Sequence, residues 1–502
     1  MTTAQAARNA DATTMRVKRV KCVSASIMPI LGSLLLSACV VGPDYHRAEV
    51  TVPANYKEPA PSAAADGWKS SQPQNAASDA QWWSIYADPV LDGLEQQVEV
   101  SNQSLQVSEA AFRQSDAVLR QARAAFFPAL TLNAGATRSR SSTSGGQHQL
   151  SSQFDLGVDA NWAPDLWGRI HRTVESNAAS AQASAADLAS ARLSIQAQLA
   201  SDYFELRIAD ELKRLLDETV IAYKRSLTIT QNRYAVGVAA KSDVVTAQTQ
   251  VQNTLAQSIN VGVQRAKLEH AIAVLIGKAP SELSIDAIPL TNTLPEIPAG
   301  LPSTLLERRP DIASAERLMA ASNAQIGVAI SAYFPDLSLS GSAGYASSTI
   351  SQLLNAPMRV WSVGPQLAAT LFDAGVHSAQ VAAARAAYDA SVANYRQTVL
   401  SSFQQVEDEL STQAVLKQQA EVQQQAIALA KEAEQLALNE YKAGIVDFTS
   451  VVQAQAIALS TEQSGLTIQQ DQFVASVTLI EALGGGWDSS KLPQSRQLAR
   501  GF

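Results

Sequence analysis

The chain has 502 residues and a formal net charge of −8, and only 6% of its side chains are aromatic. The acidic balance argues against a broad nucleic-acid-binding surface, which needs clustered positive charge. The low aromatic content favours long helices packed on small side chains over a thick aromatic core. Both cysteines, Cys22 and Cys39, lie near the N-terminus, so the rest of the chain has neither a disulfide framework nor a cysteine metal site.

The N-terminal segment has the layout of a secretory signal. A basic cluster at residues 16–21 precedes an apolar stretch at residues 27–36. About ten apolar residues are too few for a transmembrane helix, which needs about 20. Met15 directly precedes the basic cluster, so it is an alternative start to Met1.

The apolar stretch ends in Leu36-Ser37-Ala38-Cys39, which resembles the bacterial lipobox. This resemblance implies that residues 1–38 are removed and that a covalent lipid, including palmitate, is attached to Cys39. An ordinary signal peptide with a chance cysteine is the alternative. Beyond Cys39 no apolar run is long enough for a helical membrane span of about 20 residues.

A helix is expected at residues 89–125, and two alternating segments follow it at residues 129–137 and 153–162. From Phe154 to Trp162, apolar residues alternate with polar residues or glycine, which predicts a strand with one apolar and one polar face. A polar loop, residues 138–152, joins the two strands. Their length suits a tilted strand that crosses a bilayer, and an edge hairpin of a soluble sheet is the alternative.

A very long helix is expected next, because residues 169–236 contain neither glycine nor proline. Such a helix would reach about 100 Å at 1.5 Å per residue. Its apolar residues recur at steps of three and four, as in a coiled coil; examples are Leu212, Leu216, Val220, Tyr223 and Leu227. A shorter helix, residues 241–276, returns after a turn at Gly237.

The second half of the chain repeats the first at a shift of 207 residues, so the repeat must be interpreted before any single motif. It predicts helices at 312–332, 376–443 and 448–483, strands at 336–345 and 360–371, and a second turn at Gly444. The coinciding landmarks are Pro128/Pro335, Gly157/Gly364, Gly168/Gly375, Tyr234/Tyr441, Gly237/Gly444 and Gly277/Gly484. The expected units are residues 39–80, repeat 1 at 81–277, a linker at 278–300, repeat 2 at 301–487 and a tail at 488–502.

Four strands cannot form a closed barrel alone, since single-chain barrels start at about eight strands. Open sheet edges are not tolerated in lipid. Several copies must therefore share one barrel, and a homotrimer with twelve strands is the simplest solution. The predicted fold is an α+β membrane protein with two internal repeats, in which the long helices lead away from the barrel.

Five motifs together resemble the outer-membrane factors of bacterial tripartite RND-type efflux systems, in their lipoprotein branch, the NodT family. The resemblance runs from Cys39 to about Trp487. It implies passive export of drugs or other small molecules, with a periplasmic adaptor (a membrane fusion protein), an inner-membrane RND-type pump and outer-membrane lipid as partners. It also implies that the β-barrel continues as a long periplasmic α-helical barrel, with residues 39–80 and 278–300 on an equatorial belt. The motifs are Val41-Gly42-Pro43-Asp44-Tyr45, Arg308-Arg309-Pro310-Asp311-Ile312, Ala324-Gln325-Ile326-Gly327-Val328-Ala329, Tyr333-Phe334-Pro335 and Ala482-Leu483-Gly484-Gly485-Gly486-Trp487.

The same resemblance implies a gate at the helix tips. It pairs Asp243, just after the first tip turn, with Tyr441, just before the second, so that the pair holds the tip shut. An acidic ring expected nine residues after Gly444 is replaced by Gln453, and Ser450 is also uncharged; Asp447 is a nearby substitute. A solvated carboxylate or a helix cap is the alternative role for Asp243.

The sequence gives no sign of an enzyme. It has no phosphate-binding loop of the Gly-x4-Gly-Lys-Ser/Thr type, and its five histidines lack metal-ligand spacing. No catalytic residue, metal site or cofactor other than the Cys39 lipid is predicted. The alternative functions are the exit duct of type I protein secretion, a metal-efflux channel, and a lipid-anchored periplasmic coiled-coil scaffold.

Overall fold

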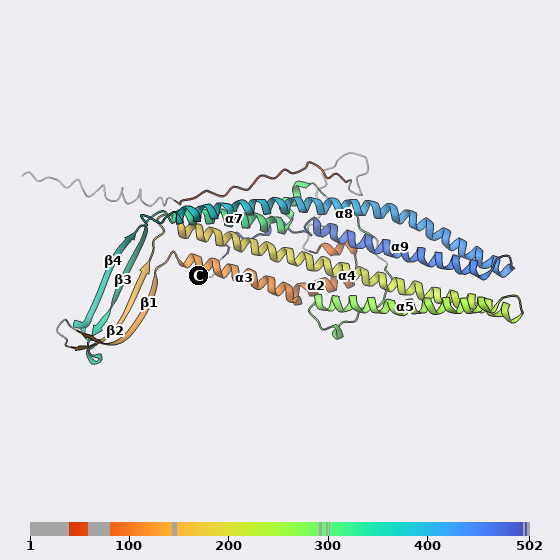
Figure 1. Ribbon diagram of the computed structural model, residues 1–502, viewed down its shortest axis with the longest axis horizontal. Helices are drawn as coiled ribbons and strands as arrows, with labels where there is room; N and C mark the ends of the chain where they lie inside the picture. Colours follow the sequence, from red (N-terminus) through yellow and green to blue (C-terminus); the bar gives the residue numbers. More distant parts are fainter. Residues whose placement is uncertain are drawn as a thin grey trace, which may run out of the picture.

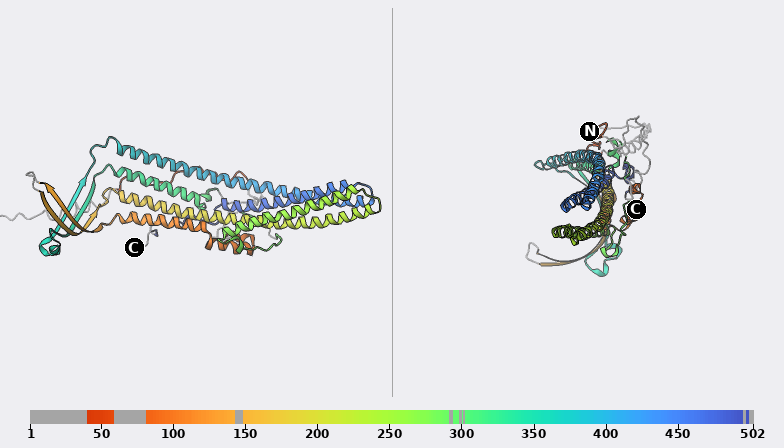
Figure 2. Two further views of the ribbon diagram at one scale, coloured as in Figure 1. Left: turned by 60° about the horizontal axis from the view of Figure 1, so that its bottom comes forward. Right: turned by 90° about the vertical axis from the view of Figure 1, so that its right-hand side faces the viewer.

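The computed structural model describes residues 40–58, 81–142, 148–290, 294–297, 300, 302–494 and 497–498. The signal segment and Cys39 lie outside these residues. The chain is highly elongated, with a four-stranded sheet at one end and paired helices that run to the other (Figure 1). Viewed along the long axis, the helices lie on an arc rather than a closed ring (Figure 2).

The two halves of the chain contain corresponding elements in the same order, although α6 has only 4 residues where α2 has 13. In the first half these are α2 (Pro89–Ser101), α3 (Gln103–Ala124), β1 (Ala129–Ser142), β2 (His148–Trp162), α4 (Arg169–Ala235) and α5 (Lys241–Leu275). In the second half they are α6 (Leu305–Arg308), α7 (Pro310–Ser331), β3 (Asp336–Ser347), β4 (Arg359–Ala368), α8 (Val376–Ala443) and α9 (Phe448–Ala482). The starts of α3 and α7, β1 and β3, α4 and α8, and α5 and α9 are each 207 residues apart.

The sheet is antiparallel with the order β1-β2-β3-β4. Leu130 pairs with Ala160, Phe154 with Ser347, and Asp336 with Ala368. Each half supplies one hairpin, and the β2–β3 pairing joins the halves. The outer edges of β1 and β4 have no strand partner within the described chain.

The strands differ from the predicted bounds at their ends. The expected loop at residues 138–152 is largely strand, because β1 and β2 stay paired out to Ser142 and His148, and the Ser139 and Ser151 hydroxyls lie 2.8 Å apart across them. Strand β4 ends at Ala368 rather than at residue 371, since its partner β3 begins at Asp336.

The predicted helix at residues 89–125 is in fact two helices, α2 and α3, separated at Asn102. The buried Asn102 side chain accepts a hydrogen bond from Leu105 N at 2.9 Å and thereby caps α3. Its amide also donates to the Leu275 carbonyl at the end of α5 at 2.6 Å. One side chain therefore satisfies two helix ends and fixes where the helices meet.

The largest core among the described residues lies midway along the molecule, where α2, α4 and α9 meet. We call this level the waist. It is more aromatic than the composition predicted: Phe204 stacks on Phe473 at 4.6 Å between ring centroids and lies 4.8 Å from Tyr86. Toward the sheet, α4 instead buries small residues, among them Ala178, Ala181, Ala183 and Ala186. The small-residue packing and the aromatic core thus occupy different levels of the molecule.

Residues 40–58 run along the outside of α4, α7 and α8 (Figure 1). The buried Arg172 side chain donates to the Val41 carbonyl at 3.1 Å and pairs with Asp44 at 2.9 Å. Farther along, Lys57 N donates to the Glu407 carboxylate at 2.7 Å. These contacts fix the segment that follows Cys39 from the sheet junction to the waist.

Candidate functional site

The two helix tips end in matching turns. Gly237 and Gly444 have φ of 77° and 78°, a left-handed conformation that glycine adopts without strain. Val238 N donates to the Arg233 carbonyl, and Ile445 N to the Glu440 carbonyl, both at 2.9 Å. The turns therefore reverse the chain in the same way at both tips, at the end farthest from the sheet (Figure 1).

The carboxylates at the two tips act as helix caps. Asp243 accepts a hydrogen bond from Ala240 N at 3.3 Å. Asp447 accepts from Ser450 N at 3.0 Å and from the Ser450 hydroxyl at 2.8 Å. Each tip thus has one carboxylate near the positive end of a helix dipole. At the 207-residue shift, Asp243 aligns with Ser450 and Ala240 with Asp447. The acid is therefore the third residue of the helix at the first tip and the N-cap residue at the second.

The hydrogen bonds to Asp447 also set its charge state. Those from the Ser450 side chain and backbone stabilise the ionised form and hold the pKa of Asp447 below its usual value. The carboxylate is fully exposed, so its ionisation affects the stability of the start of α9 and not that of a buried core.

The expected pairing of Asp243 with Tyr441 is not formed within this chain. Tyr441 is only 3% exposed, and among the described residues its hydroxyl has no hydrogen-bond partner. Its ring instead lies against Phe448, at 5.3 Å between centroids, and under the Arg233 guanidinium at 4.7 Å. Contacts of its ring therefore hold Tyr441 in place, whereas the Asp243 carboxylate accepts a hydrogen bond from the start of its own helix, α5.

Arg233 connects the two tips. It belongs to α4, and its Nη1 donates to the Lys442 carbonyl at the end of α8 at 2.9 Å. Together with the cation–π contact to Tyr441, this bond ties the first hairpin, α4/α5, to the second hairpin, α8/α9. Sequence reasoning missed Arg233, although an arginine four residues before a tip glycine is placed to reach the neighbouring tip.

A buried glutamine on α9 forms a second connection. Gln455, which is 2% exposed, donates to the Ser226 hydroxyl on α4 at 3.3 Å and accepts from Gln250 on α5 at 3.1 Å. The Tyr223 hydroxyl donates to the Gln455 backbone carbonyl at 3.0 Å. These three bonds cross from one hairpin to the other, and we call them the Gln455 joint.

The spacing of buried residues along α9 contains a signal for Gln455 that the sequence-based prediction did not use. Gln455 falls on the buried stripe of α9 formed by Phe448, Val451 and Ala458, where a polar residue is costly unless it is satisfied. The predicted Gln453, two residues away, is exposed on the same helix. The buried position, and not the exposed one, holds the hairpins together.

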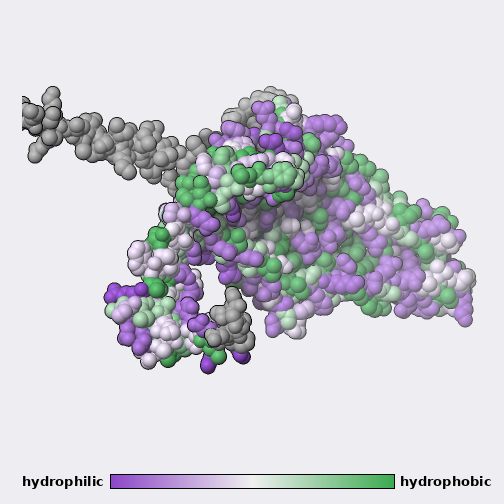
Figure 3. All heavy atoms as spheres, turned by 60° about the vertical axis from the view of Figure 1, so that its left-hand side comes forward, coloured by the Kyte–Doolittle hydropathy of each residue, from purple (hydrophilic) through white to green (hydrophobic). Residues whose placement is uncertain are grey.

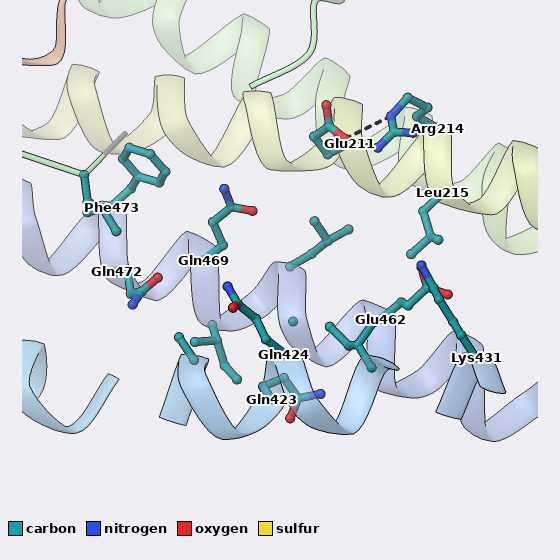
Figure 4. A pocket seen from close by; sticks show the side chains of 16 residues that line it. Glu211, Arg214, Leu215, Gln423, Gln424, Lys431, Glu462, Gln469, Gln472 and Phe473 are labelled. Carbon is teal, nitrogen blue, oxygen red and sulfur yellow. Dashed lines mark hydrogen bonds and ion pairs between the residues drawn. The ribbon is translucent and has the colours of Figure 1, made fainter. Parts of the chain in front are cut away.

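A crevice of about 420 Å³ lies between α4, α8 and α9 closer to the waist, and Figure 4 shows side chains from the three helices converging on it. Its charged groups pair with one another: Arg214 with Glu211 and Lys431 with Glu462, each at 2.7 Å. Burial raises the pKa of the neighbouring Glu434, and the charge of Glu462 adds to this effect. Each charged side chain among the described residues that line the crevice is therefore paired with another.

Among the described residues, no group of three or more histidine, cysteine, aspartate or glutamate side chains could hold a metal ion. No described helix is long and apolar enough to cross a membrane.

Comparison with known proteins gives a consistent result along nearly the whole chain. A family model described as outer membrane efflux protein matches residues 94–278 and 301–485. The toluene efflux pump outer membrane protein TtgC of Pseudomonas putida is 31% identical over 464 residues, covering 91% of this chain and 94% of that protein. The cation efflux system protein CusC of Escherichia coli is 27% identical over 466 residues, covering 92% and 98%. The solved structure of the outer-membrane channel OprN is 31% identical, with a TM-score of 0.81 over 89% of this chain and 100% of that chain.

Proposed function

This chain belongs to the outer membrane efflux protein family, and on that basis we propose that it is the passive exit duct of a tripartite pump. It is an outer-membrane efflux channel that extends into the periplasm. We assign it the export of drugs or other small molecules, driven by an inner-membrane RND-type pump. The observation that carries this proposal is a short sheet with an exposed apolar face, continued by helices of about 100 Å.

The sheet supports a trimeric assembly. Leu132 is 71% and Val363 78% exposed on one face of the sheet, as expected for side chains that face lipid. Because unpaired strand edges are not tolerated in a bilayer, β1 and β4 need partners from other copies. Three copies supply twelve strands and place three helical arcs around one tunnel.

The tips support a gate that opens by movement between hairpins. Within one chain, the α4/α5 and α8/α9 hairpins are joined near the tip by Arg233, the ring of Tyr441 and the Gln455 joint. Outward movement of one hairpin would break these bonds and widen the tunnel. Asp243, Asp447 and Ser450 keep the helix ends intact during that movement, and Gly237 and Gly444 form the turns.

The N-terminal segment supports a lipid anchor on Cys39. Val41 N donates to the Trp167 carbonyl at 3.2 Å, and Trp167 stacks on Phe334 at 4.8 Å between the strands and the long helices. Aromatic side chains are typical of the membrane interface. Val41 therefore lies at the level of the membrane interface, which supports our proposal that Cys39 carries an acyl chain in the inner leaflet of the outer membrane.

The tips also present a surface for the periplasmic adaptor. Val236 and Ile445 are each 73% exposed at the end of the molecule farthest from the sheet. Apolar side chains at the centre of a polar rim are typical of protein–protein contacts. The exported compound itself is left open, since the relatives are named for toluene in one case and for a cation in another.

Planar-bilayer recording of the purified protein tests the duct directly. The proposal predicts ion conductance that rises when the tip contacts are weakened. A lipid-anchored scaffold would give no conductance under any condition. Drug profiles of a deletion strain would then identify the exported class, and sensitivity to metal ions alone would favour metal efflux.

A further inference from the structure

The charged residues of the sheet are separated by face. The strand pairing places the even residues of β1 and β2 and the odd residues of β3 and β4 on one side. That side carries the exposed apolar residues Leu130, Leu132, Val363 and Leu367. Every arginine of the four strands lies on this apolar face: Arg138, Arg140 and Arg359.

The opposite face carries every aspartate of the four strands: Asp155, Asp159 and Asp336. Asn133 donates to Asp159 on this face, as expected for side chains in contact with water. A lipid-facing surface without acidic residues but with three arginines is unusual, because a cation that faces hydrocarbon is costly.

The position of the arginines along the strands explains how they are tolerated. Arg138 follows Leu130 by eight residues on β1, and Arg359 precedes Leu367 by eight on β4. Eight residues span about 27 Å of strand, or roughly 20 Å of height at the usual barrel tilt. The arginines thus lie at the outer edge of the apolar band, at the end of the sheet farthest from the helices. Figure 3 shows polar side chains among apolar ones at this end.

Among the described residues, the three arginines have no counter-charge. Arg138, Arg140 and Arg359 are exposed, and none of them forms an ion pair or hydrogen bond with any residue that the structure describes. A guanidinium at this level therefore faces either water or the headgroups of the outer leaflet. Its planar fork matches a phosphate with two parallel hydrogen bonds.

Closure of the barrel would bring these residues together, and this step rests on the trimer proposed above. Strand β4 of one copy would lie beside β1 of the next, with the arginine-bearing end of both strands pointing away from the helices. Each of the three seams would then present Arg359 from one copy and Arg138 and Arg140 from its neighbour. Apolar side chains below them would contact acyl chains.

We propose that each subunit seam binds a phosphate-bearing lipid of the outer leaflet, through Arg138, Arg140 and Arg359. The arginines bind the phosphate, and the apolar rows of β1 and β4 pack against the acyl chains. The bound lipid would seal the seam from outside, since it contacts both copies at once.

Native mass spectrometry of the purified protein in detergent tests this site, with bisphosphorylated lipid A as the probe. The triple variant Arg138→Gln, Arg140→Gln and Arg359→Gln should bind the lipid at least tenfold more weakly than the unmodified protein. Arg113→Gln, an exposed arginine on α3 beside Glu109, is the matched control and should bind normally. Dephosphorylated lipid A should bind weakly to all three proteins, and added inorganic phosphate should not displace the intact lipid.

The same spectra separate failure of the lipid site from failure of the trimer. Intact trimers that bind lipid A equally well with and without the three arginines would overturn the lipid site and leave the channel proposal standing. Equal binding of phosphorylated and dephosphorylated lipid would overturn it as well. A spectrum of single chains would overturn the trimer and, with it, the seam.

Discussion

The Gln455 joint gives the sharpest test of the gate. Replacement of Gln455 by alanine removes two side-chain hydrogen bonds between the hairpins, to Ser226 and from Gln250, and leaves the bond from Tyr223 to the backbone. At about 1 kcal/mol for each neutral bond, the closed tip loses about 2 kcal/mol in each protomer. Since 1.4 kcal/mol is a factor of ten, the ratio of open to closed tips should rise by roughly 30-fold.

Single-channel recording in planar bilayers measures that ratio, and vancomycin uptake by cells reports the same opening. Gln453→Ala is the matched control, because it truncates the same residue type on the same helix at an exposed position. Gln455→Leu keeps the side-chain volume and should behave like Gln455→Ala, which separates lost hydrogen bonds from lost packing. If trimers of Gln455→Ala open no more often than trimers of Gln453→Ala, the Gln455 joint does not keep the tip closed.

Three further changes test the remaining parts of the site. Tyr441→Phe should leave the conductance unchanged because the hydroxyl has no partner, whereas Tyr441→Ala should make the channel leakier in recordings; equal leakage from both would contradict the role of the ring. The lowered pKa of Asp447 means that its cap stabilises α9 fully above the usual aspartate pKa of about 3.9 and less as the pH falls through the lowered value. The first turn of α9 should therefore fray only in acid, as measured by amide hydrogen exchange, and Asp447→Asn, which still accepts a hydrogen bond, should remove that dependence; an unchanged acid response in the variant would count against the cap. Cys39→Ser should abolish labelling with radioactive palmitate, and retained label would exclude Cys39 as the lipid site.

The long elements could be predicted because each is encoded locally. The absence of glycine and proline from residues 169–236 and 376–443 predicts two helices that the structure contains almost unchanged, as α4 and α8. Alternation likewise located all four strands. Their ends could not be predicted, because β1 continues into polar residues only where β2 pairs with it, and β4 stops where β3 begins.

The contacts between the two tips were predicted less well, because they join residues more than 200 positions apart. Asp243 and Tyr441 lie at the predicted tips, but their pairing rested on a resemblance and is replaced in this chain by a helix cap and an arginine–tyrosine contact. Gln455 looks like any other glutamine in a glutamine-rich helix until its neighbours on the stripe are known to be buried. The family prediction, by contrast, is confirmed, because it rested on five motifs in order.

The mass of the detergent-solubilised particle tests the central claim most directly. The account requires three copies to close the barrel, so it predicts a particle with three times the mass of the 53.3 kDa chain, less the signal segments. A particle with the mass of one chain would contradict the shared barrel. A particle of two chains would give eight strands and would contradict the twelve-stranded duct.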